Sequence, residues 1–252
     1  MDLKTFFTEN PRVALAFSGG ADSAYLLYAA KHSGCDIHAY FIYSAFQPQF
    51  ELDDAKKLAD ALNVPLTVAQ VDVLQDPNVT ANDPLRCYYC KTALFTRLLE
   101  LAHNDGYPLL MDGTNASDLA GDRPGMRALQ ELGVRSPLRE CGLTKSEIRR
   151  LSKEAGLFTH NKPAYACLAT RIPTGTKITQ EQLEKVAKGE AALFSMGFTD
   201  FRIRCFHGAA RIQLPESQFP LALSKRDELM RELSPWFDGV LLDLAPRSGK
   251  DG

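Results

Sequence analysis

The sequence lacks the features of a protein that binds nucleic acid over a broad surface. It has no run of five basic residues, and its 29 Lys and Arg residues are balanced by 31 Asp and Glu residues. Affinity for DNA or RNA depends on neutralising many phosphates with Lys and Arg, so a net charge of −2 disfavours such a partner. We therefore expect no nucleic-acid partner.

Membrane and export signals are also missing. No apolar stretch approaches the roughly 20 residues that span a bilayer, and no signal-peptide pattern is present. We expect a cytoplasmic protein with no membrane partner. Because 45% of the 252 residues are hydrophobic, the chain has room for one large core, or for a core and a small second domain.

The chain is too large and too apolar to need disulfide bonds, so its six cysteines either pack or take part in metal and sulfur chemistry. Cys35, Cys141 and Cys205 lie in no motif and are predicted to pack. Cys87 and Cys90 form a Cys-x-x-Cys pair at the opening of a predicted helix, where the helix dipole and flanking basic residues stabilise thiolates. A second such pair is missing, which excludes a zinc ribbon. A redox dithiol, two half-buried helix cysteines, and an iron–sulfur site completed by a third cysteine remain open.

Another cysteine, Cys167, lies in a distinctive segment. Pro163 and Pro173 hold this segment extended, and Lys162 and Arg171 are near enough in sequence to favour the thiolate. A lone cysteine usually packs, so the prolines and basic neighbours make Cys167 the candidate third ligand.

A glycine-rich turn follows the first predicted strand, where residues 13–23 read Val-Ala-Leu-Ala-Phe-Ser-Gly-Gly-Ala-Asp-Ser. Adjacent glycines let the backbone turn tightly and bring its N–H groups close to an anion at the positive end of the next helix. The Gly-x-x-x-x-Gly-Lys-Ser/Thr motif of loops that cleave the γ-phosphate is missing. The turn instead resembles the pyrophosphate loop of enzymes that adenylate a substrate with ATP, although a Gly-Gly turn can also simply join strand to helix. The predicted ATP-binding residues here are Ser18, Gly19, Gly20, Asp22 and Ser23.

The first 160 residues alternate strand-like and helix-like segments, which is typical of an α/β fold with a parallel twisted sheet and helices on both faces. The predicted strands are 13–17, 37–43, 66–73 and 109–111, and the predicted helices are 24–32, 51–62 and 92–103. Ligands bind beyond the carboxyl ends of such strands, so the glycine-rich turn and residues 112–115 are expected to face one crevice. Asp112, Gly113 and Asn115 therefore join the predicted nucleotide site.

The pattern changes in the second half of the chain. Thr144 and Glu147 predict a capped helix that ends before Gly156. A helix (181–196), two strands (201–204 and 210–214) that turn at His207-Gly208, a helix (221–233) and a strand (240–244) come later. We predict an ATP-binding domain at 1–160, a cysteine-bearing active-site loop or linker at 161–176, and a small α/β module for substrate binding and oligomerisation at 177–252.

Four motifs together resemble one enzyme family. They are the glycine-rich turn, Arg-Cys-Tyr-Tyr-Cys-Lys at 86–91, Asp-Gly-Thr-Asn-Ala-Ser-Asp at 112–118 with Asp-Arg-Pro-Gly at 122–125, and Lys-Pro-x-x-x-Cys-Leu-Ala-Thr-Arg at 162–171. The combination looks like the LarE family, the sulfur transferases of the PP-loop ATP pyrophosphatase superfamily that act in nickel-pincer nucleotide synthesis and mature lactate racemase. The resemblance covers nearly the whole chain and implies a homo-oligomer.

The resemblance also implies a reaction. ATP and Mg²⁺ serve to adenylate a carboxylate of pyridinium-3,5-biscarboxylic acid mononucleotide, a small nucleotide substrate, and sulfide or another sulfur donor then replaces AMP. In one branch of the family the position of Cys167 gives up its own sulfur and becomes dehydroalanine. This chain resembles the other branch, in which three cysteines, here Cys87, Cys90 and Cys167, hold a [4Fe–4S] cluster.

Several residue roles are implied by the resemblance alone. Asp118 joins the nucleotide site, and Lys91 joins Asp22 and Cys167 as a candidate catalytic residue. The candidate substrate-binding residues are Arg171, Glu190, Arg202 and Arg204. A Glu on an amphipathic helix and an Arg-x-Arg strand are also typical of side chains that only face water. The segment 242–249 departs from the Gly-Tyr-Arg-Ser-Gly pattern expected there, which leaves the role of Arg247 open.

Two other functions fit part of the pattern. A transfer RNA thiolation enzyme also pairs this loop with a Cys-x-x-Cys and a cluster, but the weak basic balance disfavours it. A nucleotide-binding sensor without turnover needs the loop alone. Pyrophosphate release in the presence of substrate separates the enzymes from the sensor.

Overall fold

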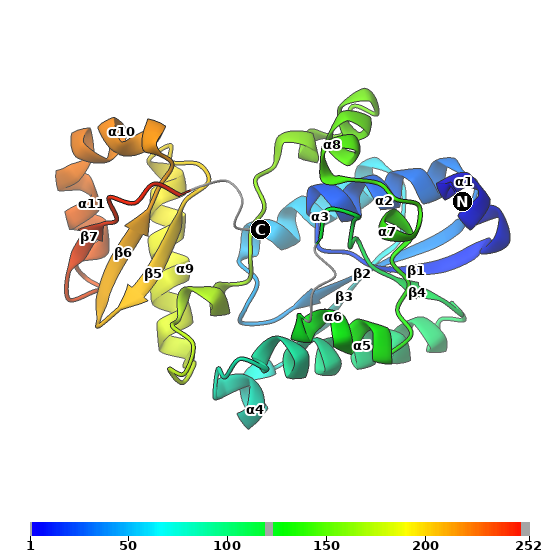
Figure 1. Cartoon of the computed structure of the whole chain (residues 1–252), viewed down its shortest axis with the longest axis horizontal. Coiled ribbons are helices and arrows are strands. Elements are labelled where there is room, and N and C mark those ends of the chain that lie inside the picture. Colours follow the sequence, from blue (N-terminus) through cyan, green and yellow to red (C-terminus); the bar gives the residue numbers. More distant parts are fainter. Residues whose placement is uncertain (1, 119–122, 248–252) are drawn as a thin grey trace. The chain divides into compact units, whose positions relative to one another are not determined.

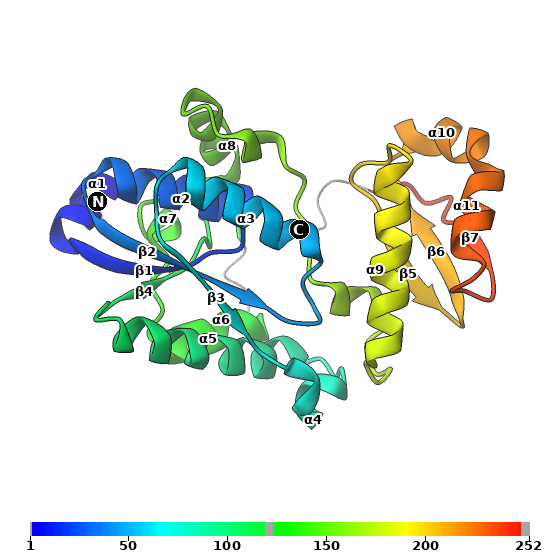
Figure 2. The ribbon, with the colours of Figure 1, turned by 180° about the vertical axis from the view of Figure 1, so that it is seen from behind.

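The computed structural model describes residues 2–118 and 123–247, which form two compact units (Figures 1 and 2). Unit 1 contains the residues up to Val73 and Leu85–Lys162. Unit 2 contains Leu74–Pro84 and the residues from Pro163 onward. Within the described ranges, no helix has the length and apolar character needed to cross a membrane.

Unit 1 is built on a parallel sheet with the strand order β3-β2-β1-β4. The central strand β1 pairs with β2 on one side and β4 on the other. Helices α2 and α3 cover one face, and α5 and α6 cover the other (Figure 1), which confirms the predicted α/β architecture. The bounds are β1 Arg12–Ala16, β2 Asp36–Tyr43, β3 Leu66–Gln70, β4 Leu110–Met111, α2 Ala21–His32, α3 Gln49–Ala61, α5 Arg86–Asn104 and α6 Pro124–Glu131.

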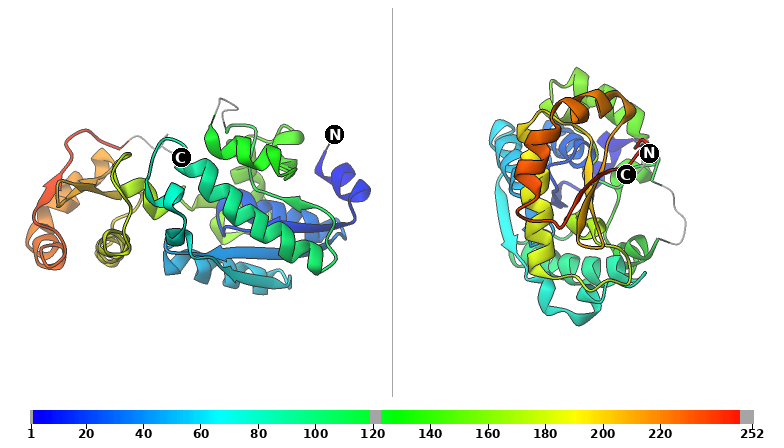
Figure 3. Two further views of the ribbon diagram at one scale, coloured as in Figure 1. Left: turned by 90° about the horizontal axis from the view of Figure 1, so that it is seen from below. Right: turned by 90° about the vertical axis from the view of Figure 1, so that its left-hand side faces the viewer.

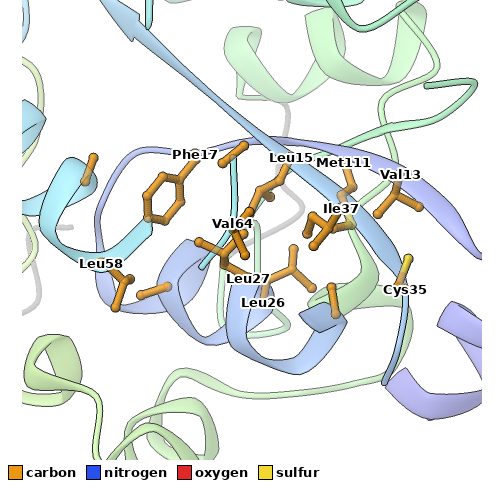
Figure 4. Packing of buried hydrophobic residues seen from close by; sticks show 14 of the residues in the cluster. Val13, Leu15, Phe17, Leu26, Leu27, Cys35, Ile37, Leu58, Val64 and Met111 are labelled. Carbon is orange, nitrogen blue, oxygen red and sulfur yellow. The ribbon is translucent and has the colours of Figure 1, made fainter. Parts of the chain in front are cut away.

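Alternating side chains of β1 enter two hydrophobic cores. Val13 and Leu15 pack with Leu26 and Leu27 of α2 in the larger core, part of which Figure 4 shows. Ala14 faces the opposite way and packs in the smaller core, which contains side chains of α5 and α6. Because β1 is buried on both faces, it reads in the sequence as a continuous apolar run. This burial fixes the end of β1, and therefore the position of the glycine-rich turn.

Some predicted boundaries in unit 1 are wrong. Helix α5 begins at Arg86 rather than at residue 92, because its first turn is polar and hides the apolar periodicity. Strand β3 ends at Gln70, since Val73–Gln75 forms a short 3₁₀ helix, η1. The predicted capping box at Thr144 and Glu147 is confirmed. The remaining elements are α1 Leu3–Glu9, α7 Pro137–Glu140, α8 Lys145–Glu154 and the 3₁₀ helix η2 Phe158–Asn161.

Unit 2 contains a mixed sheet with the order β5-β6-β7, in which β5 and β6 are antiparallel and β6 and β7 are parallel. Helix α9 packs closely on β5, since a Cβ on Gly189 would lie 2.8 Å from Ile203 Cδ1 (Figure 3). The single helix predicted at 221–233 is wrong, because the backbone at Lys225 (φ −98°, ψ 12°) divides it into α10 and α11. The bounds are α4 Pro77–Thr80, η3 Leu168–Arg171, α9 Gln180–Ser195, β5 Arg202–Phe206, β6 Ala209–Gln213, η4 Glu216–Gln218, α10 Phe219–Ser224, α11 Arg226–Leu233 and β7 Val240–Leu242.

The segment Leu74–Pro84 is tied to residues 172–178 within unit 2. The buried Asn82 side chain donates hydrogen bonds to the carbonyl groups of Pro173 (2.9 Å) and Thr176 (3.0 Å). The Gly175 N–H in turn donates to the Asn82 carbonyl (2.8 Å). These bonds hold the stretch that follows Cys167 in a defined conformation.

Candidate functional site

The glycine-rich turn joins β1 to α2 and requires glycine at residue 19. Gly19 has φ +69°, and a Cβ there would lie 3.1 Å from the Glu51 carbonyl oxygen and 3.2 Å from the Ala55 nitrogen on α3. A side chain at this position is therefore disfavoured by both backbone conformation and space. Across the turn, the hydroxyl groups of Ser18 and Ser23 are hydrogen-bonded at 3.0 Å.

The amino terminus of α2 is free of a side-chain cap among the described residues. The N-cap residue is Gly20, which has no side chain that could cap the helix. The helix is 12 residues long. The first N–H groups of a helix have no partner inside the helix, and the helix dipole places positive potential there. This end of α2 therefore has the chemistry of an anion site next to a tight glycine turn.

The segment after β4 lies directly against the first turn of α2. A Cβ on Gly113 would lie 2.9 Å from the Ser23 nitrogen, which shows how closely the two backbones approach. The Asn115 amide donates to Asp22 Oδ2 (3.2 Å), and Asp118 accepts from the Asn115 N–H (2.9 Å). The two segments that the sequence places beyond neighbouring strands thus meet in the structure.

Asp22 is the electrostatically unusual residue of this region. Its Oδ1 atom is buried and has no hydrogen-bond partner among the described residues. Burial raises the pKa of the Asp22 carboxyl group; the positive charge of Lys145 opposes this rise, and the charge of Asp118 adds to it. A buried carboxylate with an unsatisfied oxygen beside an anion site has the donor chemistry to bind a hard cation such as Mg²⁺. The residues present therefore fit an ATP–Mg²⁺ site.

Sequence reasoning missed several hydrogen bonds that support the turn and the predicted nucleotide site. Asp112 accepts a hydrogen bond from the Ser136 hydroxyl (2.7 Å). Lys162 donates to the Gly19 carbonyl (3.1 Å) and pairs with Asp54 (2.6 Å), partners 143 and 108 residues away. The sequence predicts that Lys162 favours the Cys167 thiolate, whereas in the structure its ammonium group contacts Gly19 and Asp54. No local pattern could reveal such distant partners.

Cys87 and Cys90 are the second and fifth residues of α5, so both lie at the opening of a helix, as predicted. Cys87 is exposed, Cys90 is half-buried, and the Arg86 guanidinium donates a hydrogen bond to Cys87 Sγ at 3.3 Å. Gly125 is the second residue of the adjacent helix α6, and a Cβ there would lie 3.1 Å from Lys91 Cδ and 3.6 Å from Cys87 Cβ. Gly125 therefore lets α6 approach the face of α5 that carries Cys87 and Lys91.

The other cysteines behave as packing residues. Cys35 is buried in the larger core of unit 1, and Cys141 packs against that core. Cys205 is half-buried on β5, and burial raises the pKa of its thiol. Asp122 lies outside the described residues. Over the ranges that the structure describes, no group of three or more His, Cys, Asp or Glu side chains is arranged to hold a metal ion.

Three of the four residues predicted to bind substrate, Arg171, Glu190 and Arg202, are buried, and Arg204 is half-buried, so the alternative that these side chains only face water is wrong. Arg171 and Glu190 are each 1% exposed and form a bidentate ion pair with distances of 2.8 Å and 3.1 Å. Burial alone would lower the pKa of Arg171, but the hydrogen bonds and charge of Glu190 raise it. Arg202 is 2% exposed, and its burial, with the charges of Arg171 and Arg247, lowers its pKa to about 10.

Arg247 lies in the same unit and has a structural partner. Its Nε pairs with Asp200 at 3.0 Å, and its N–H donates to the Leu214 carbonyl at 2.8 Å. Gly249, at the end of the segment that departs from the expected pattern, lies outside the described residues. Arg247 thus fixes the chain after β7 against unit 2.

Comparison with known proteins identifies the family. The protein-family model described as "Queuosine biosynthesis protein QueC" matches residues 12–82, which include the glycine-rich turn. An uncharacterized protein of Synechocystis sp. is 38% identical over 220 residues, which cover 86% of this chain and 81% of that protein. Pyridinium-3,5-bisthiocarboxylic acid mononucleotide synthase of Lactiplantibacillus plantarum is 36% identical over 243 residues, which cover 95% of this chain and 88% of that protein. The chain belongs to the family of this synthase.

Membership of this synthase family confirms the resemblance to LarE and makes the chain an enzyme, a sulfur transferase of the PP-loop type. A more distant match is the tRNA-specific 2-thiouridylase MnmA of Pseudothermotoga lettingae, 27% identical over 217 residues that cover 71% of this chain and 62% of that protein. The synthase family match is longer and stronger.

Proposed function

We propose that this enzyme uses ATP to adenylate a carboxylate of pyridinium-3,5-biscarboxylic acid mononucleotide, releases pyrophosphate, and then replaces AMP with sulfur to give the thiocarboxylate. The observation that carries the proposal is the buried, unsatisfied Asp22 oxygen beside the uncapped amino terminus of α2. The match to the synthase of L. plantarum over 95% of the chain supports the choice of substrate.

In the adenylation step, a carboxylate oxygen of the substrate attacks the α-phosphorus of ATP and pyrophosphate leaves. The first backbone N–H groups of α2 bind the departing pyrophosphate, because they have no side-chain cap and the helix end adds positive potential. Asp22 would hold Mg²⁺ through its unsatisfied oxygen, and the metal would shield the charge of the phosphates. Asp112, Gly113, Asn115 and Asp118 complete the nucleotide site.

In the second step, a sulfur nucleophile attacks the acyl carbon and AMP leaves. We assign this step to Cys167, with Cys87 and Cys90 as further thiolate ligands of a [4Fe–4S] cluster and Lys91 as a basic residue beside them. The exposed Cys87 sulfur accepts a hydrogen bond from Arg86, and cysteine sulfur is the ligand type that iron–sulfur clusters use. Such a cluster supplies an iron that can carry an extra sulfide. Substrate contacts of Arg202 and Arg204, and assembly into a homo-oligomer, stay predictions.

Two variants separate the two steps. Asp22→Ala should lower pyrophosphate release by about a hundredfold or more, since it removes a preorganised electrostatic group. Cys167→Ala should leave pyrophosphate release nearly unchanged and stop sulfur transfer. Asp60→Ala, on the exposed face of α3, is the matched control. A folded Asp22→Ala enzyme that releases pyrophosphate at the normal rate would refute the loop assignment.

The cluster has its own test. Anaerobically purified Cys87→Ser or Cys90→Ser protein should contain less iron and acid-labile sulfide than wild type or the Cys141→Ser control. Intact-mass analysis after reaction supplies the second readout. A wild-type chain that loses about 34 Da in one turnover, as when cysteine becomes dehydroalanine, would contradict the cluster and make Cys167 the sulfur donor. Activity that requires tRNA and falls steeply with salt would instead support tRNA thiolation.

A further inference from the structure

The segment that carries Cys167 is held by two buried cationic side chains and one half-buried cationic side chain of unit 2. Three arginines donate hydrogen bonds to its carbonyl groups: Arg202 to Ala164, Arg171 to Ala166, and Arg204 to Thr170. These carbonyl groups lie on both sides of Cys167 in the chain. Hydrogen bonds from charged donors are roughly twice as strong as neutral ones, so the backbone around the cysteine is firmly fixed.

Glu190 connects this segment to the rigid elements of unit 2. Its carboxylate accepts both hydrogen bonds of the Arg171 ion pair and a further one from the Ile203 N–H of β5 (2.9 Å). It also accepts a hydrogen bond from the Tyr165 hydroxyl, two residues before Cys167. Glu190 itself lies on α9. The carboxylate therefore ties the cysteine segment to a helix and to a strand at once.

Arg171 also reaches the Cys167 backbone through Thr170. The Thr170 hydroxyl accepts a hydrogen bond from Arg171 (2.8 Å) and donates to the Cys167 carbonyl (2.8 Å). The Thr170 N–H donates to the same carbonyl at 3.0 Å. This chain of bonds fixes the direction of the Thr170 hydroxyl and the orientation of the Cys167 peptide group.

The contacts of Arg171 and Glu190 leave little capacity for a substrate. The three guanidinium nitrogens of Arg171 all donate to protein groups, and both Glu190 oxygens accept from protein groups. Both side chains are 1% exposed. A substrate anion would have to displace Glu190 and leave a buried carboxylate unpaired, which is costly.

We propose that Arg171 and Glu190 are positioning residues that hold the backbone on both sides of Cys167, so that its thiol is presented in one orientation for sulfur transfer. The catalytic part of this inference rests on the proposed function, because it requires Cys167 to act in that step. Small displacements of a reacting group cost large factors in rate, which gives such positioning its value.

The test uses a variant that should still fold. Arg171→Met combined with Glu190→Met removes both charges and keeps similar volumes, and replacing a buried ion pair in this way is often neutral or stabilising. It also removes the hydrogen bonds to Ala166, Thr170 and Tyr165 and the one that Glu190 accepts from the Ile203 N–H. The control is Arg150→Met with Glu154→Met, which removes an exposed ion pair from α8 in unit 1.

The first readout is the rate at which iodoacetamide alkylates Cys167 in the full-length protein after iron removal, measured by peptide mass spectrometry. Cys205, half-buried in the same unit, is the internal reference for general opening of unit 2. We expect the rate at Cys167 to rise about tenfold in the double variant, as for loss of a charged hydrogen bond, while Cys205 is unchanged. Equal rates in variant and wild type, or a parallel rise at both cysteines, would overturn the proposal.

The second readout separates positioning from substrate binding. Positioning predicts a lower kcat for sulfur transfer, by about tenfold to a hundredfold, with the KM for the pyridinium substrate unchanged. A raised substrate KM with normal Cys167 alkylation would show that these residues bind substrate instead. Tyr165→Phe, which removes one hydroxyl contact to Glu190, should give a smaller change in the same direction. If wild type shows no sulfur transfer at all, the proposed function fails, but the alkylation result still decides the positioning.

Discussion

The glycine-rich turn of unit 1 and the segment of unit 2 that carries Cys167 are held in place by different interactions. The loop at residues 18–23 depends on glycine conformation, hydroxyl groups a few residues apart and the end of a helix. The cysteine segment depends on buried charges that come from α9 and β5, such as Glu190, which lies 19 residues from its partner Arg171. The proposed anion site leaves the first N–H groups of α2 without a side-chain cap, whereas the carbonyl groups around Cys167 accept hydrogen bonds from protein side chains.

This difference predicts opposite responses to mutation. Loss of a single side chain from the glycine-rich turn should change the unfolding free energy little but lower the activity strongly, because the proposed function reserves these groups for ligand. The cysteine segment should lose stability as soon as one partner is removed, because the other charge is then left buried and unpaired. The following experiments test this contrast, from the largest expected effect to the smallest.

Glu190→Ala should cost about 3–5 kcal/mol of unfolding free energy, the usual cost of leaving a buried charge without its partner. The single tryptophan, Trp236, lies in unit 2, so its fluorescence in a urea titration reports on that unit. Glu154→Ala, which breaks the exposed Arg150 pair in unit 1, is the control and should change stability by less than about 1 kcal/mol. A Glu190→Ala protein as stable as wild type would show that the buried network does not hold unit 2 together.

The same contrast explains what the sequence could reveal. The glycine-rich turn, the parallel sheet and the capping box at Thr144 depend on residues close in sequence, and these were predicted correctly. The burial of Glu190 and Arg171 could not be predicted. A charged residue on an amphipathic helix or in a loop has the same local sequence pattern whether it forms a buried ion pair or faces solvent.

Boundaries failed where tertiary contacts override local pattern. The amphipathic pattern at 221–233 continues through Lys225, although the backbone breaks there. Lys162 shows the same limit at the candidate site: its contacts with Gly19 and Asp54 depend on the fold of unit 1 and carry no signal near residue 162. Segment 74–84 likewise joins unit 2 through Asn82, whose partners lie more than 90 residues later in the chain.

Gly19→Ala should destabilise unit 1 more than a glycine-to-alanine substitution that introduces the same backbone strain but no steric contact. Gly133 has the same φ of +69° but nothing within 4 Å of an added Cβ, so Gly133→Ala is the matched control and should cost about 1 kcal/mol. At Gly19 the added Cβ also meets backbone atoms of α3, which cannot rotate away. Urea unfolding followed by circular dichroism measures the difference, and pyrophosphate release should fall only in Gly19→Ala. Equal stability losses would mean that α3 gives way.

Asp22→Asn should have the smallest effect on stability, and the opposite sign. Because burial raises the pKa of Asp22 above its ordinary value of 3.8, the folded protein retains this proton at pH values where the unfolded chain has lost it. Stability therefore falls as pH rises from the ordinary pKa through the raised pKa, and the loss persists at neutral pH.

Asparagine removes the buried charge, so the variant should unfold at a slightly higher temperature than wild type at pH 7, yet release almost no pyrophosphate. The gain should shrink as the pH falls towards the ordinary value of 3.8, because the folded wild type then carries more of the Asp22 proton. Thermal unfolding at both pH values, with exposed Asp60→Asn as control, measures this. A lower unfolding temperature for Asp22→Asn at pH 7 would show that the carboxylate stabilises the loop by itself, and that its open oxygen is not reserved for ligand.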